Sequence, residues 1–164
     1  MNRYPDKYAG FTLVELIAVV LILGILAIVM VPRYLSTNQF NDRGFYDQTF
    51  SLLRYAQKAA IAQRRSVCVS FSKTTITLRI AKVSGGGTLC TINNTVPLNG
   101  GNGSNTFQIS AKTGTEFTNI AGVSVTPINF FFNGSGQASV GQTFRVSEFS
   151  ENITIEQDTG YVHP

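Results

Sequence analysis

Few side chains in this sequence have the chemistry needed for catalysis. The 164 residues include one histidine, His163, and two cysteines, Cys68 and Cys90. Three such residues cannot form a zinc site of four His and Cys ligands within one chain. A Ser-His-Asp triad would have to recruit a histidine that lies one residue from the C-terminus. We therefore expect no catalytic residue, no metal site and no cofactor, and we do not expect an enzyme.

Glu15 is a carboxylate in unusual surroundings. It is followed by Leu16–Val31, a run of sixteen apolar or glycine residues. As a helix, Phe11–Val31 would span about 31 Å, which is the thickness of the hydrocarbon core of a bilayer. A carboxylate in such a segment costs about 2.5–3.5 kcal/mol near the bilayer centre, less near the interface, and usually has a partner charge. No basic residue lies within the segment, so we expect a partner from a neighbouring molecule or a new chain terminus.

Three interpretations of this segment compete. A cleaved secretory signal needs a shorter apolar core, followed by a cleavage site with small residues, but Val31 is followed by PRYLSTNQF. A plain signal anchor fits the length and leaves Glu15 unexplained. A buried helix of a soluble core is excluded because the segment is long and has no polar face.

The junction at residues 10–15 resembles the type IV prepilins and the pseudopilins of type II secretion. Gly10-Phe11-Thr12-Leu13-Val14-Glu15 matches their processing motif of Gly, then Phe, with Glu at the fifth mature position. The resemblance implies that prepilin peptidase cuts between Gly10 and Phe11 and methylates the amine of Phe11. It also implies that Glu15 neutralises the N-terminal ammonium of an adjacent subunit.

The same resemblance implies a location and partners. Residues 1–10 would be a cleaved leader, and 11–31 would be a transmembrane and assembly helix in the bacterial inner membrane. The rest of the chain would be periplasmic until it enters a pilus or pseudopilus. Besides prepilin peptidase, the expected partners are the membrane, other pilin or pseudopilin subunits and the inner-membrane assembly platform.

Hydrophobic periodicity predicts a second helical stretch after the apolar run. Phe45, Thr49, Leu52, Ala56 and Ala60 share one face of a helix. Pro32 should bend the helix without ending it. We expect helix from about Phe11 to Arg65, weakest near residues 36–44, with residues 32–65 as an amphipathic continuation that packs on a sheet.

After Arg65 the spacing of the apolar residues changes from a period of 3.6 residues, as in a helix, to a period of 2, as in a strand. Residues 67–72 and 75–80 alternate as in a half-buried β-hairpin. Further strands are predicted at 88–92, 106–111, 122–126, 128–132, 142–147 and 152–156, with a closing segment at 160–163. Residues 66–164 should therefore form a β-rich globular domain, and the predicted class is α+β, with one long N-terminal helix on an antiparallel sheet as in pilins.

Within the prepilins, the chain resembles the GspH/FimT-type subgroup. An Ala-containing helix, LLRYAQKAAIAQR at 52–64, runs directly into a strand that begins Val67-Cys68-Val69. The segment FFNGSG at 131–136 resembles the Phe-x-x-x-Gly turn of that subgroup, and residues 153–162 resemble its C-terminal strand pair. The resemblance implies a minor pilin or pseudopilin.

The expected oxidation state of the two cysteines depends on the compartment of the domain. In a periplasmic domain a disulfide between Cys68 and Cys90 is the default, and closing this loop would stabilise the fold by about 3 kcal/mol in the chain-entropy model. Two buried thiols are the alternative. Their spacing is not Cys-x-x-Cys, which argues against a redox role.

Charge is distributed unevenly along the chain. Residues 33–82 carry nine basic and two acidic side chains, a net charge of +7, whereas residues 83–164 carry a net charge of −3. This asymmetry suits contacts between like subunits, uneven solvation, or a basic face on an anionic partner. Two alternative functions therefore stay open, a DNA-binding minor pilin and an unassembled, membrane-anchored periplasmic binding protein. The sequence does not distinguish a secretion pseudopilus from an adhesive, twitching or DNA-uptake pilus.

Overall fold

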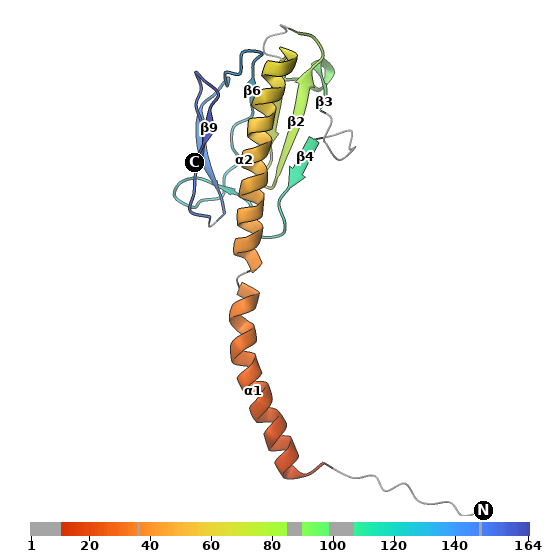
Figure 1. Ribbon diagram of the computed structural model, residues 1–164, viewed down its shortest axis with the longest axis vertical. Helices are drawn as coiled ribbons and strands as arrows, with labels where there is room; N and C mark the ends of the chain where they lie inside the picture. Colours follow the sequence, from red (N-terminus) through yellow and green to blue (C-terminus); the bar gives the residue numbers. More distant parts are fainter. Residues whose placement is uncertain (1–10, 36, 85–89, 99–106, 148) are drawn as a thin grey trace, which may run out of the picture. The chain divides into compact units, whose positions relative to one another are not determined.

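A computed structural model describes residues 11–35, 37–84, 90–98, 107–147 and 149–164 (Figure 1). The chain divides into two compact units, one that ends at Thr37 and one that runs from Asn38 to Pro164. Helix α1 (Leu13–Leu35) belongs to the first unit, and helix α2 (Thr37–Gln63) opens the second. The predicted leader, residues 1–10, lies outside the described residues.

Two helices occupy the range in which we expected one. The first ends at Leu35 and the second begins at Thr37. Ser36, between them, lies outside the described residues, and the rest of the range 36–44, which we expected to be weakest, is helical. Pro32 lies inside α1 and does not end it, and Gly44 lies inside α2.

Short strands follow α2, and all of their pairings are antiparallel. In the described residues they are β1 (Val67–Phe71), β2 (Thr75–Ala81), β3 (Thr95–Pro97), β4 (Phe107–Ser110), β5 (Phe117–Thr118), β6 (Phe130–Phe132), β7 (Gln142–Val146), β8 (Ile153–Ile155) and β9 (Val162–His163). One sheet has the order β3-β2-β1-β6, with β4 also paired to β2, and the second has the order β5-β7-β8-β9. The α+β class predicted from the sequence is confirmed.

Two of the predicted strands were misplaced. Of the strand expected at 88–92, residues 88 and 89 lie outside the described residues, 90 and 91 are irregular, and Ile92 begins a short 3-10 helix (Ile92–Asn94), which strand β3 follows. The strand expected at 122–126 is a loop with a single bridge, Thr118 to Ser124, and the neighbouring strand is β5. In both places the observed strand pairs with a distant segment, β2 or β7, so tertiary pairing overrides local propensity.

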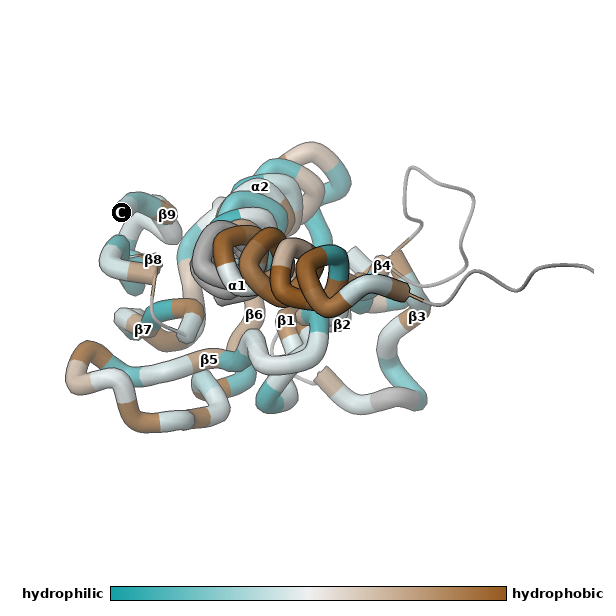
Figure 2. The backbone as a smooth tube through the Cα atoms, turned by 90° about the horizontal axis from the view of Figure 1, so that it is seen from below, coloured by the Kyte–Doolittle hydropathy of each residue, from teal (hydrophilic) through white to brown (hydrophobic). Residues whose placement is uncertain are grey.

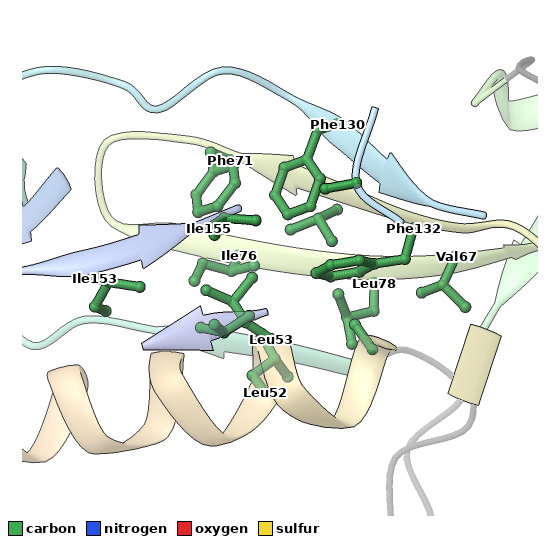
Figure 3. Packing of buried hydrophobic residues seen from close by; sticks show 14 of the residues in the cluster. Leu52, Leu53, Val67, Phe71, Ile76, Leu78, Phe130, Phe132, Ile153 and Ile155 are labelled. Carbon is green, nitrogen blue, oxygen red and sulfur yellow. The ribbon is translucent and has the colours of Figure 1, made fainter. Parts of the chain in front are cut away.

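One hydrophobic core joins α2 to both sheets. The inward face of α2 contributes Leu52 and Leu53, which lie beneath the strands in Figure 3. From the sheets come Phe132, Ile76 and Ile153, all fully buried. Alanines 56, 59 and 60 of α2 are also buried, and their small side chains allow the helix backbone to approach the sheet closely.

Helix α2 ends in a Schellman motif with arginine at the position where glycine is preferred. The N–H of Arg64 donates to the carbonyl of Ile61 and the N–H of Arg65 donates to the carbonyl of Ala60, both at 3.2 Å. Arg64 has a φ of 48°, in the left-handed region that glycine adopts without a Cβ penalty.

We expect Arg64→Gly to raise the free energy of unfolding of the globular unit by about 0.5–1 kcal/mol, because it relieves this backbone strain. The Arg64 side chain is exposed, so its removal costs little packing. Urea denaturation followed by near-ultraviolet circular dichroism measures the change. Lys58→Gly, at an exposed position inside α2, is the matched control and should lower stability by about 1 kcal/mol. A loss of stability in both variants would contradict the strained cap.

Candidate functional site

Helix α1 begins with a side-chain cap two residues after the predicted cleavage point. The hydroxyl of Thr12 accepts a hydrogen bond from the backbone N–H of Glu15 at 3.3 Å. This is the N-cap contact that satisfies one of the free N–H groups of a first helical turn. The cap sets the helix start at Leu13, so Phe11 lies just outside the helix and is 83% exposed. Gly10 lies outside the described residues.

The cap was not predicted from the sequence, although a signal for it was present. Threonine followed three residues later by glutamate, before an apolar run, is the spacing of a capping box. In Thr12-Leu13-Val14-Glu15 this spacing coincides with the processing motif. Thr12 therefore positions the backbone on which Glu15 is presented.

Glu15 lies in the first turn of α1 with its side chain exposed. The positive end of the helix dipole favours a carboxylate at this position, typically by 0.3–1 kcal/mol. Among the described residues the only ion pair is that between His163 and Glu156, so Glu15 has no charged partner within that part of the chain. The carboxylate is free to meet a charge from another molecule.

Apart from Glu15, the side chains described for α1 are apolar and unburied. Its large apolar residues from Leu13 to Leu26 are between 49% and 76% exposed. In the described part of the chain, no helix meets the combined requirement of length and apolarity for crossing a membrane.

The predicted disulfide is present in the globular unit. Cys68, buried in β1, is bonded to Cys90, and their Cα atoms lie 5.7 Å apart. The bond links β1, an interior strand of the first sheet, to the segment that leads into β3 across a sequence separation of 22.

Arg54 holds the C-terminal strand against α2. Its Nε and Nη2 atoms donate to the carbonyl of Val162 at 3.3 and 3.2 Å, and its guanidinium lies 4.2 Å from the centre of the Phe50 ring. One turn further along, the side-chain amide of Gln57 donates to the carbonyls of Gly136 and Thr159. These contacts hold Arg54, one of the nine basic residues of 33–82, on the C-terminal strand.

The first turns of α2 are fixed by buried polar contacts. The Thr115 hydroxyl donates to the carboxylate of Asp42 at 2.5 Å, and the Tyr46 hydroxyl donates to the carbonyl of Asn152 at 3.1 Å. Burial raises the pKa of Tyr46, and the nearby Glu151 carboxylate raises it further. Tyr46 therefore stays neutral at physiological pH and keeps its donor proton. Both contacts join α2 to the segments that flank β5 and β8.

The C-terminal residues form strand β9 and make side-chain contacts. His163 is half-buried in β9, with Nε2 3.2 Å from Glu156 Oε1 and its ring stacked on Tyr161. The described residues contain no group of three or more His, Cys, Asp or Glu side chains placed to hold a metal ion.

One comparison with known proteins finds a family motif in the N-terminal segment. Residues 5–31 match the model of the prokaryotic N-terminal methylation motif. No curated protein and no solved structure matches the chain at a significant level. The motif indicates a type IV pilin-like precursor that is processed by prepilin peptidase, and it supports a place for this chain in the prepilin superfamily.

Proposed function

We propose that this chain is a minor pilin or pseudopilin, a structural subunit that assembles through its N-terminal helix. The observation that carries the proposal is the methylation motif at residues 5–31, which contains Gly10, Phe11 and Glu15 at the spacing of a processed prepilin. Cleavage falls between Gly10 and Phe11, and Phe11 carries the methylated amine. The function is structural and requires no catalytic group.

Glu15 pairs with the N-terminal amine of Phe11 on a neighbouring subunit. Its exposed position in the first turn of α1 leaves it accessible to that amine. In apolar surroundings an unpaired carboxylate is costly, whereas a carboxylate with an ammonium partner is tolerated. The pair therefore favours the axial register in which the two charges meet.

The apolar surface of α1 is covered first by lipid and then by other helices. Its large apolar side chains from Leu13 to Leu26 are exposed in the single chain, and the sequence run from Phe11 to Val31 has the length of a membrane span. The precursor would be a single-pass protein of the bacterial inner membrane with a periplasmic globular unit. The Cys68–Cys90 disulfide supports that location, because disulfides persist in the periplasm and are rare in the cytosol.

The subtype that we propose is the GspH/FimT-type minor pilin or pseudopilin. The passage from helix to strand supports it, since α2 ends at Gln63 and β1 begins at Val67. The C-terminal strand pair β8–β9 also supports it, because Ile155 pairs with Val162 within the segment that resembles the C-terminal strand pair of this subgroup.

Replacing Glu15 by glutamine should sharply reduce the amount of subunit recovered in cross-linked assemblies. Glutamine keeps the size and polarity of the side chain and removes the charge that pairs with the Phe11 amine. The measurement is chemical cross-linking of cells that express the native machinery, with quantification of subunit ladders. We expect a loss of roughly tenfold, which is the effect of about 1.4 kcal/mol on an assembly equilibrium.

Glu151→Gln is the matched control, because Glu151 is an exposed carboxylate of the globular unit. This variant should assemble as the natural chain does. N-terminal processing is measured in both variants, so that a failure of cleavage is not mistaken for a failure of assembly. If processed Glu15→Gln enters ladders at the natural level, the proposed charge pair is wrong.

A further inference from the structure

A hollow of about 580 Å³ lies between the last turns of α2 and the edge of the first sheet. Tyr55 and Gln63 line it from α2, and Arg65 lines it just beyond the end of the helix. The apolar part of its wall consists of Ile80 in β2 and of residues 96–98. The hollow thus combines hydrogen-bonding side chains with an apolar wall.

The guanidinium of Arg65 is the unsatisfied group of this hollow. Its Nε atom is buried without a hydrogen-bond partner, and among the described residues the side chain forms no ion pair. A buried donor without an acceptor is unfavourable, and a guanidinium can bind a carboxylate through two parallel hydrogen bonds. The adjacent residue, Arg64, has an exposed side chain and adds a second positive charge. The ligand that suits the hollow is therefore a carboxylate.

An exposed acidic turn lies between β8 and β9. The turn is held against α2 by the side-chain amide of Gln57, which donates to the carbonyl of Thr159 at 3.0 Å. Asp158 is exposed, and within the part of the chain that the structure describes its carboxylate has no ion-pair or hydrogen-bond partner. Glu156 is exposed in the same turn, and the nearby ring of Tyr161 is 55% exposed. This surface offers a free carboxylate with an aromatic ring close to it.

The hollow and the acidic turn lie on opposite sides of α2. Figures 1 and 2 show β3 and β4 on one side of this helix and β8 and β9 on the other. Side-chain contacts agree, because the Tyr55 ring stacks on Phe107 of β4 at 5.1 Å, whereas Arg54 donates to the carbonyl of Val162 in β9. Each surface is therefore left for a different neighbouring molecule.

We propose that Asp158 of one copy of this chain binds Arg65 of a second copy. The two surfaces are complementary in charge, in keeping with the net charge of +7 on residues 33–82 and −3 on residues 83–164. The exposed ring of Tyr161 gives the acidic surface an apolar part that matches the wall of the hollow.

A contact between two different surfaces of one protein is heterologous, and it can continue from copy to copy into an open filament. Such a contact gives the globular unit a part in assembly, besides that of the N-terminal helix. The inference rests on the proposed function, because it names a contact between assembled subunits.

Charge reversal tests this pair in the full chain, expressed as its only form in cells with the native machinery. Arg65→Glu and Asp158→Arg each bring two like charges together, so each should lower the yield of cross-linked ladders about tenfold or more. The double variant restores an opposite pair and should recover to within about twofold of the natural chain. Lys73→Glu is the matched control, because Lys73 is exposed in the turn at the other end of β1. It should assemble at the natural level.

The recovery in the double variant decides the identity of the partner. If both single variants lose assembly and the double variant does not recover, Arg65 and Asp158 do not meet, and the inference is wrong. Retention of an oligonucleotide that is lost in Arg65→Glu, with ladders unchanged, would assign the site to nucleic acid and would also overturn it. Absence of ladders from the processed natural chain would contradict the proposed function itself.

A cysteine test keeps both charges and stands if Arg65→Glu fails to fold. Gln63→Cys and Gln157→Cys, both at exposed positions, are introduced into separate full chains, which are co-expressed and oxidised with copper phenanthroline. We expect disulfide-linked dimers in the mixture and none from either variant alone, because the contact joins different surfaces. Lys73→Cys with Gln157→Cys is the control and should give no dimer. Ladders without a dimer in the first mixture would overturn the inference and leave the proposed function intact.

Discussion

Replacing Phe117 by alanine is expected to lower the free energy of unfolding of the globular unit by about 3–5 kcal/mol. The Phe117 side chain is fully buried, and its ring centre lies 5.2 to 5.5 Å from those of Phe45, Phe71 and Phe144. These rings come from α2, β1 and β7. Alanine would leave a cavity where the helix and both sheets meet, so the site cannot collapse without moving all three.

Urea denaturation of the full chain in detergent micelles measures this change, with near-ultraviolet circular dichroism reporting on Tyr46 and Tyr55 in the globular unit. Phe40→Ala is the matched control, because it removes the same side chain from a position that is 78% exposed. It should change stability by no more than about 0.5 kcal/mol. A loss of less than 1 kcal/mol for Phe117→Ala would show that this aromatic cluster is not the centre of the core.

Removing the disulfide should cost about 3 kcal/mol. The Cys68–Cys90 bond closes a loop with a sequence separation of 22, and in the chain-entropy model such a cross-link destabilises the unfolded chain by that amount. The paired substitution Cys68→Ala and Cys90→Ser tests the prediction. It keeps the buried position 68 apolar and the exposed position 90 polar.

The same urea experiment, with and without a thiol reductant, separates the cross-link from the substitutions. Reductant should lower the unfolding midpoint of the natural chain toward that of the double variant and should leave the variant unchanged. An unfolding midpoint that is insensitive to reductant in the natural chain would contradict a stabilising disulfide.

The β-hairpin was predictable because each of its strands carries its own signal. Large apolar residues occupy every second position of β1 and β2, although Cys68 between them is also buried. A short turn joins the strands in a register that places Val67 opposite Ile80 and Phe71 opposite Ile76. The position of β3 was not predictable. Its register, Ile80 opposite Val96, depends on a strand more than ten residues away, and the residues before it have enough β propensity to mislead.

Strand β5 shows a second limit of local patterns. It has two residues, Phe117 and Thr118, which are too few for any periodicity to appear. Its position is set by the fit of the Phe117 ring among three other phenylalanines. Such a fit depends on tertiary packing, so the neighbouring sequence contains no signal that predicts it.

The candidate site likewise contains some features that the local sequence predicts and others that it does not. Gly10, Phe11 and Glu15 form a contiguous motif, so their interpretation needed no tertiary information, and the Thr12 cap was readable from the same six residues. The contact between Arg54 and Val162 joins residues 108 positions apart. The sequence gives no means of telling such an arginine from a free cation on a basic face.

The most direct test of processing as a prepilin is the intact mass and N-terminal sequence of the full chain. The chain is extracted from the membranes of cells with an active prepilin peptidase. We predict that residues Met1 to Gly10 are missing and that the new terminus is an N-methylated Phe11. An intact Met1 terminus in those cells would contradict cleavage at Gly10, and the proposed pairing of Glu15 with a Phe11 amine would fall with it.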